Sequence, residues 1–329
     1  MIIITNRNIQ KKAKPEERYG RKFNDQNPDE LTLATANKVN GVWKVDIIDD
    51  DFDAKKEDSE GQFASEKVFK ELQLKMKKEK KNCLFFVHGF NNDFSDVLER
   101  AYLLEQNYKV EVVAFSWPAN GRDGKGKFLG TVTGTASYLS DKREASKSYS
   151  ALDRSLEKMG NYFRKYSDET LACNQNLSLF LHSMGNYLLE HYTLTGGYDK
   201  TCIFDNIVMA GADVNNEGHE VWVDQLKFRK RLYIVINEND KALLSSRLKL
   251  GEEQKPRLGH WVKNLKAKNP WYIDFSDAKH VNENSHSYFE GKPIAKNEHI
   301  KHVFTKMFNG EKVELDLELD STMNAYKVK

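Results

Sequence analysis

Cysteine is scarce in this sequence, and the cysteines present do not form a framework. Cys83, Cys173 and Cys202 are the three cysteines among 329 residues, and they are widely separated and odd in number. Such spacing excludes the disulfide scaffold that small secreted domains use. No Cys-x-x-Cys pair occurs, so a zinc site built on cysteine is not expected.

Long hydrophobic runs are also missing. The apolar run within residues 1–7 is too short for the hydrophobic region of a secretory signal peptide. No stretch approaches the roughly 18 consecutive apolar residues of a membrane-spanning helix. The sequence therefore predicts a soluble, cytoplasmic protein with no membrane span.

Neither sign of charge is in clear excess. The chain has 51 basic and 49 acidic residues, a formal net charge of +2, which gives no reason to expect a nucleic-acid partner. The basic run at 75–81 is interpreted as a solvated helix end. The acidic residues at 49–53 could bind a cation, but a solvated turn is the preferred interpretation.

What the sequence does contain is a series of short apolar runs that alternate with helical patterns. Apolar residues make up 39% of the chain, and its length suits one large α/β domain with insertions. The alternation predicts a mostly parallel central sheet with helices on both faces. Strands are expected over 2–5, 42–48, 83–87, 110–117, 177–181, 207–210, 231–236 and 271–275, and helices over 65–80, 94–108, 141–166, 185–193 and 299–308.

The domain organisation follows from the same pattern. Residues 1–65 are polar and irregular, and we expect an N-terminal extension that adds edge strands to the same domain. Residues 66–310 form the main domain, and 311–329 a C-terminal tail. In open sheets of this class, ligands bind beyond the carboxyl ends of the strands, so polar residues at those ends are the candidate site.

Ser183 is the most informative of these residues. A predicted strand precedes it, and Gly185 follows at the start of a predicted helix. A serine in such a sharp turn is a nucleophile elbow, which lifts the hydroxyl above the sheet edge and aims the Met184 N–H at a developing negative charge. The usual pattern is Gly-x-Ser-x-Gly, and Leu181 stands where the first glycine would be.

A second turn provides a partner for the Met184 N–H. The run His88–Asn92 follows directly on a predicted strand. A His-Gly turn at this place lets a backbone N–H, that of Phe90, point into the site and complete an oxyanion hole. The alternative is an ordinary loop in which Asn92 or Asp93 caps the next helix.

A serine nucleophile needs a neutral imidazole to accept its proton and a carboxylate to hold that imidazole in the right tautomer. Asp240 follows the strand over 231–236 and is the expected acid, with Asp213, after the preceding strand, as the alternative. His286 follows the last strand and is the expected base, with His280 as its competitor. His182 should point away from the adjacent serine and serve packing.

Four segments together resemble the α/β-hydrolase superfamily, and most closely its bacterial branch of uncharacterised lipase-like serine hydrolases. The resemblance covers roughly residues 82–310, and the chain order Ser, Asp, His is that of the superfamily's triads. It implies Ser183 as nucleophile, His286 as base and Asp240 as acid. It also implies Phe90 and Met184 as oxyanion donors, and neither metal nor cofactor. The segments are His88–Asn92, Phe115–Pro118, His182–Asn186 and His286–Phe289.

The leading hypothesis is a serine hydrolase that cleaves a carboxylic ester, with a lipid or another small-molecule acyl ester favoured. An acyltransferase on the same fold and a non-catalytic binding scaffold are the alternatives. The glycine-rich segment 119–138, a loop and helix insertion after the strand that ends at Trp117, is expected to be a flap that selects the substrate. A plain surface loop is the other interpretation.

Overall fold

The structure is a computed structural model that describes residues 1–48, 63–119, 131–165, 175–248 and 255–329. Its strands are β1 (Ile2–Thr5), β2 (Arg7–Ile9), β3 (Tyr19–Phe23), β4 (Thr32–Val39), β5 (Val42–Ile48), β6 (Cys83–Val87), β7 (Glu111–Ser116), β8 (Leu177–His182), β9 (Asn206–Ala210), β10 (Arg231–Ile236), β11 (Pro270–Asp274), β12 (Glu318–Asp320) and β13 (Ala325–Lys327).

The α-helices are α1 (Ala64–Glu79), α2 (Phe94–Tyr108), α3 (Thr131–Lys147), α4 (Tyr149–Lys165), α5 (Gly185–Leu194), α6 (Glu220–Val223), α7 (Lys241–Arg247), α8 (Lys292–Lys296) and α9 (Glu298–Phe308). Short 3₁₀ turns lie at η1 (Pro15–Glu17), η2 (Gly197–Ile203), η3 (Leu258–His260), η4 (Val281–Asn284) and η5 (Glu314–Asp316). None of the helices in the described ranges is both long and apolar enough to cross a bilayer.

Within these ranges the main sheet has 11 strands, in the order β12-β13-β11-β10-β9-β8-β6-β7-β1-β4-β5. The strands from β11 across to β1 pair in parallel, so their carboxyl ends meet at one edge of the sheet. Val87, for example, lies level with Leu181 on one side and Phe115 on the other. The fold is the mostly parallel α/β architecture that the sequence predicts.

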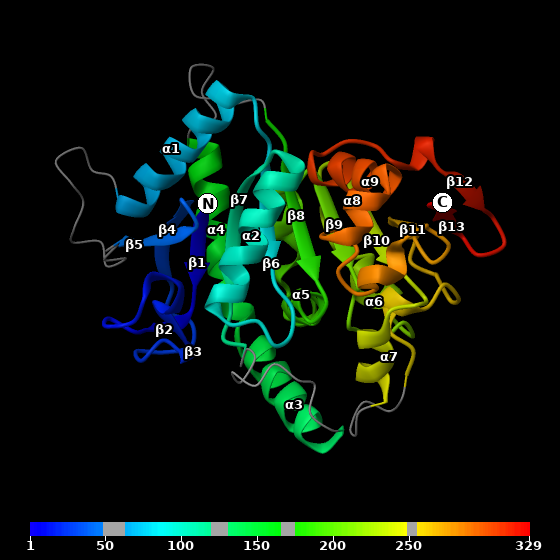
Figure 1. The fold of residues 1–329 in the computed structure, drawn as a ribbon, viewed down its shortest axis with the longest axis horizontal. Helices are drawn as coiled ribbons and strands as arrows, with labels where there is room; N and C mark the ends of the chain where they lie inside the picture. Colours follow the sequence, from blue (N-terminus) through cyan, green and yellow to red (C-terminus); the bar gives the residue numbers. More distant parts are fainter. Residues whose placement is uncertain (49–62, 120–130, 166–174, 249–254) are drawn as a thin grey trace.

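The central strands are continuous apolar runs because both of their faces are buried. One face packs against α1, α4 and α5, and the opposite face against α2 and α9. Side chains alternate between the two layers along each strand: Phe85 faces the first layer, and Phe86 the second. Figure 1 shows α2 and α9 on the near side of the sheet, with α3 and α7 beyond the strands' carboxyl ends.

The ends of the chain hold more strand than was expected. In the N-terminal extension, β1, β4 and β5 join the main sheet, while β2 and β3 form a separate pair. Residues 311–329, expected as a tail, contribute β12 and β13 beside β11. The single helix expected over 141–166 was wrong: α3 and α4 are separate, and Ser148 between them accepts a hydrogen bond from the Asn6 side chain.

Candidate active site

Ser183 occupies the sharp turn between β8 and α5. Its φ of 55° is left-handed, a conformation that costs a non-glycine residue about 1–3 kcal/mol and is found where a turn serves function. The Ser183 N–H donates to the Ala210 carbonyl at 3.0 Å, which ties the turn to the end of β9. The neighbouring Met184 is the N-cap of α5, and N–H groups at a helix start have no acceptor within the helix.

Two glycines let the backbone approach the turn closely. A Cβ on Gly89 would lie 2.6 Å from the Cβ of Ser183, and one on Gly185 would lie 2.8 Å from the Val87 carbonyl oxygen. Real Cβ atoms do not approach so closely, so both positions need glycine. Leu181, where the usual pattern has glycine, is instead fully buried in β8. The close packing of the elbow is therefore provided by Gly89 and Gly185.

Asn186 holds the same turn from within, a role that the sequence analysis missed. Its buried side-chain amide donates to the carbonyls of Ser183 at 3.1 Å and Leu181 at 3.3 Å. The Asp213 N–H also reaches the Ser183 carbonyl, at 3.3 Å. The signal was present in the sequence as an asparagine one turn after the serine, a residue that commonly bonds to nearby backbone.

The run His88–Asn92 lies between β6 and α2, and the His88 ring joins it to the end of β7. The Trp117 N–H donates to His88 Nε2 at 3.1 Å, so the proton is on Nδ1, which lies 2.9 Å from the Gly89 carbonyl. Burial, aided by the charge of Arg7, holds the pKa of His88 well below its usual value. This neutral, fully buried histidine is structural and orients the loop that carries Phe90.

Arg7 is the most unexpected residue at the site. Its side chain is fully buried, and burial lowers its pKa to about 9 although Asp93 and Asp141 act to raise it. The guanidinium donates to the Asn92 carbonyl at 2.8 Å, to the Ser116 hydroxyl at the end of β7 at 2.8 Å, and to the carbonyls of Gly20 in β3 and Ala119 at 3.1 Å and 3.3 Å. An isolated arginine after an apolar strand gave no sign of this, because its partners are distant in sequence.

Asp240 and His286 meet beyond the ends of β10 and β11. His286 Nδ1 lies 2.7 Å from Asp240 Oδ2. The other carboxylate oxygen accepts the N–H groups of Ala242 and Leu243 and so caps α7. The carboxylate is fully buried, whereas 23% of the His286 side chain is exposed. A fixed carboxylate behind a partly open imidazole is the arrangement that a general base requires.

The pKa of His286 is set by opposing effects. Burial of the ring lowers it, but the charge of Asp240 and the hydrogen bond to it outweigh burial, and the pKa lies above its usual value. A Cβ on Gly211 would lie 3.3 Å from the ring, one residue after the carbonyl that accepts the Ser183 N–H. In the described part of the chain, no hydrogen bond joins Ser183 Oγ to His286.

The two competing residues have other partners. Asp213 is buried, and it accepts hydrogen bonds from Ser246 at 2.6 Å and Tyr138 at 3.0 Å. It also lies 3.3 Å from the Arg257 guanidinium. His280 is 42% exposed and pairs with Glu283 at the surface. Asp240 and His286 are thus the acid and base candidates that the structure brings together.

Of the segment 119–138, residues 120–130 lie outside the described residues. Its two ends are anchored at the site: the Ala119 carbonyl accepts from Arg7, and Tyr138 packs edge-on against Phe90 while it bonds to Asp213. The acidic residues at 49–53 also lie outside the described ranges. Among the described residues, no group of three or more His, Cys, Asp or Glu side chains is placed to hold a metal ion.

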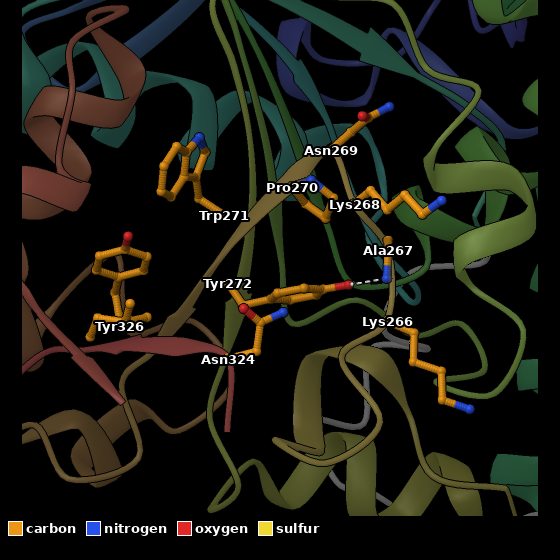
Figure 2. A pocket seen from close by; sticks show the side chains of 10 residues that line it. Lys266, Ala267, Lys268, Asn269, Pro270, Trp271, Tyr272, Asn324 and Tyr326 are labelled. Atoms are coloured by element: carbon orange, nitrogen blue, oxygen red, sulfur yellow. Dashed lines mark hydrogen bonds between the residues drawn. The ribbon is translucent and has the colours of Figure 1, made fainter. Parts of the chain in front are cut away.

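A hollow of about 510 Å³ lies elsewhere, at the start of β11 and beside β13. In Figure 2, Trp271 and Tyr326 stand on one side of it, and the Tyr272 hydroxyl accepts the Ala267 N–H at 3.0 Å. Trp271 and Tyr272 lie at the amino end of β11, so the hollow opens at the opposite end of the parallel strands from Ser183. It is no part of the candidate active site.

Comparisons with known proteins agree with this fold. Residues 62–302 match the model of a family described as alpha/beta hydrolase of unknown function (DUF900). No curated protein matches the sequence. Similar solved structures include a hyperthermophilic esterase from the archaeon Pyrobaculum calidifontis, at 12% identity and a TM-score of 0.28. A monoclinic form of the esterase has 11% identity and a TM-score of 0.27. Both matches cover 64% of this chain and 72% of the esterase chain. At these values the likeness to the esterase carries no argument about activity.

Proposed function

The chain belongs to this alpha/beta hydrolase family, and we propose that it is a serine hydrolase that cleaves a carboxylic ester through an acyl-enzyme on Ser183. The observation that carries the proposal is the hydrogen bond between Asp240 and His286, placed beside the turn that holds Ser183. A carboxylate-oriented imidazole next to a serine in a left-handed turn is an arrangement suited to nucleophilic catalysis.

In the proposed reaction, His286 Nε2 accepts the proton of Ser183 as Oγ attacks the ester carbonyl. The new oxygen–carbon bond places a negative charge on the carbonyl oxygen, which the N–H groups of Phe90 and Met184 would stabilise. The carbon–oxygen bond to the leaving alcohol then breaks, and His286 returns the proton to that alcohol. Water, activated by the same imidazole, releases the acyl group as a carboxylic acid and restores the serine.

The substrate class proposed is a small-molecule or lipid acyl ester. The two described ends of the segment 119–138 lie at Phe90 and Arg7, so these ends border the site where the acyl group would bind. Within the α/β-hydrolase fold such connecting segments are where binding differs between proteins, because function resides in loops on a shared scaffold.

Hydrolysis of a series of p-nitrophenyl esters by the full chain and by Ser183→Ala tests the proposal. We expect turnover by the wild-type protein and a loss of about 10³-fold or more in the variant, with the same thermal unfolding midpoint. Adding an alcohol acceptor and measuring both products separates hydrolysis from acyl transfer. Equal activity of the two proteins would exclude Ser183 as nucleophile.

A further inference from the structure

Arg100, in α2, lies between two loops of the proposed site and the end of β8. Its Nε and Nη2 atoms donate to the two carboxylate oxygens of Glu290, at 3.2 Å and 2.9 Å, in the loop that follows His286. Its Nη1 atom lies 3.4 Å from His182 Nδ1 and 3.5 Å from Asn92 Oδ1. The paired Arg100 and Glu290 side chains are only 19% and 14% exposed, so solvent screens the pair less than a surface pair.

The contact with Arg100 determines the tautomer of His182. A guanidinium can only donate, so Nδ1 of His182 must be the acceptor and the ring proton must be on Nε2. That Nε2–H donates to the backbone carbonyl of His286 at 3.1 Å, and the two imidazole rings lie 4.6 Å apart. Burial, with the neighbouring His286 and Arg100, holds the pKa of His182 well below its usual value, which keeps the ring neutral.

Two bonds therefore hold His286 from opposite sides: Asp240 binds its side chain, and His182 binds its carbonyl. We propose that Arg100 and His182 are positioning residues. Arg100 orients His182, and His182 holds the main chain of His286 at a fixed position relative to Ser183. The inference rests on the proposed function, because it assigns His286 as the base. It gives a role to a histidine whose place beside the nucleophile suggested packing alone.

Arg100 also acts on His286 through its charge. The charged and titratable groups around the His286 ring are Asp240 and Asp213, which raise its pKa, and Arg100 and His182, which oppose protonation. Removing the Arg100 charge should therefore raise the pKa of His286 further and move the rise of kcat/KM to higher pH. Loss of a residue that only stabilises the fold would not produce this shift, because it would change only the fraction of folded protein.

The test compares four variants with a control on the same helix. Arg100→Met removes the hydrogen-bond donors and the positive charge, whereas Arg100→Lys keeps the charge. His182→Leu removes both ring nitrogens, whereas His182→Gln keeps one donor and one acceptor. The control, Glu99→Gln, weakens the Lys38–Glu99 ion pair at 2.6 Å and leaves the contacts of Arg100 in place. Titration with a fluorophosphonate counts competent sites, so that kcat is expressed per active site.

We expect Arg100→Met and His182→Leu to lower kcat per site about 10- to 100-fold with KM changed little, because small displacements of a base cost that much. His182→Gln should recover most of the loss, and Glu99→Gln should match wild type. Arg100→Met should also shift the pH profile to the alkaline side, and Arg100→Lys should not. Folded Arg100→Met and His182→Leu proteins with wild-type kcat and pH profile would overturn the inference.

Nitrogen NMR of labelled histidine tests the same inference without any substrate. His182 should be neutral with its proton on Nε2 at neutral pH in the wild-type protein, and a proton on Nδ1 would contradict the assignment. Absence of a fluorophosphonate adduct on Ser183 in the wild-type protein would instead count against the proposed function. The two failures are therefore distinguishable.

Discussion

Asp240 holds His286 with one carboxylate oxygen and the start of α7 with the other. The two residues are 46 positions apart in sequence, and each follows its own strand of the parallel sheet. The helix N–H groups orient the carboxylate, so the direction in which it presents its free oxygen is determined before substrate binds. Changes at Asp240 should therefore alter catalysis more than they alter the fold.

Asp240→Asn should lower kcat by as much as about 10⁴-fold, because asparagine can present its amide to Nδ1 and favour the wrong tautomer. It should also move the rise of kcat/KM toward lower pH, since the carboxylate is what holds the pKa of His286 above its usual value against burial. A pH profile of the variant, measured beside wild type, decides this. An unshifted profile would show that Asp240 does not control the base.

The same substitution gives a stability signature. A histidine with a raised pKa in the folded state adds stability below its unfolded pKa of about 6.5 and loses that contribution as pH rises through the folded value. Asp240→Asn should thus lower the free energy of unfolding more near about pH 6 than at alkaline pH. Asparagine can still cap α7. Denaturant midpoints at the two pH values provide the measurement, and equal losses would contradict the assignment.

Gly89→Ala should impair catalysis because the new methyl would lie 2.6 Å from the Ser183 Cβ and 3.0 Å from the His182 carbonyl. We expect kcat to fall about 10- to 100-fold from displacement of the loop or the elbow, with a stability loss of about 1–3 kcal/mol. Gly160→Ala, in α4, is the control, because its nearest neighbour would be a side-chain methyl at 3.2 Å. Wild-type turnover by folded Gly89→Ala would show that the contact does not matter.

Arg7→Met should destabilise the protein although residue 7 lies outside the range matched by the family. Each buried acceptor left without its donor costs about 1–3 kcal/mol, and the charge no longer has to be desolvated, so we expect a net loss of about 2–4 kcal/mol. Arg229→Met, at a 60% exposed side chain, should change stability by no more than about 0.5 kcal/mol. Urea unfolding of both variants makes the comparison. Arg7→Met with the same free energy of unfolding as wild type would show that Arg7 has no structural role.

Tyr138→Phe tests whether the segment 119–138 selects the acyl group. The change removes the 3.0 Å hydrogen bond to Asp213 but keeps the ring that packs against Phe90. Because this bond anchors one end of the segment, we expect the ratio of kcat/KM values across an ester chain-length series to change several-fold. Tyr149→Phe, at a partly exposed tyrosine of α4, is the control. Unchanged ratios in folded Tyr138→Phe would assign the segment no part in selection.

The sheet could be predicted because its central strands are buried on both faces and read as uninterrupted apolar runs, as in Cys83–Val87. The short strands at the carboxyl end could not, since they are half exposed and polar: Leu319 in β12 is 50% exposed. The break between α3 and α4 was also hidden, because the helical pattern continues through Ser148 and its hydroxyl accepts a hydrogen bond from Asn6, which is distant in sequence.

The same distinction applies to the candidate site. Ser183, Asp240 and His286 could be proposed because each follows a strand, and parallel strands bring their carboxyl ends together. Arg7 and Arg100 could not, because their function depends on backbone carbonyls and loops that only the folded chain brings within reach. The catalytic roles of the first three stay predictions, and their geometry is what the experiments above test.

The most direct test of the central claim is the site of covalent labelling. A fluorophosphonate should react with the folded wild-type protein in a one-to-one ratio, and peptide mapping should place the adduct on Ser183. Labelling should be absent in Ser183→Ala and much slower in Asp240→Asn. An adduct on another serine, or no adduct on a protein that hydrolyses esters, would contradict the assignment of Ser183 as the nucleophile.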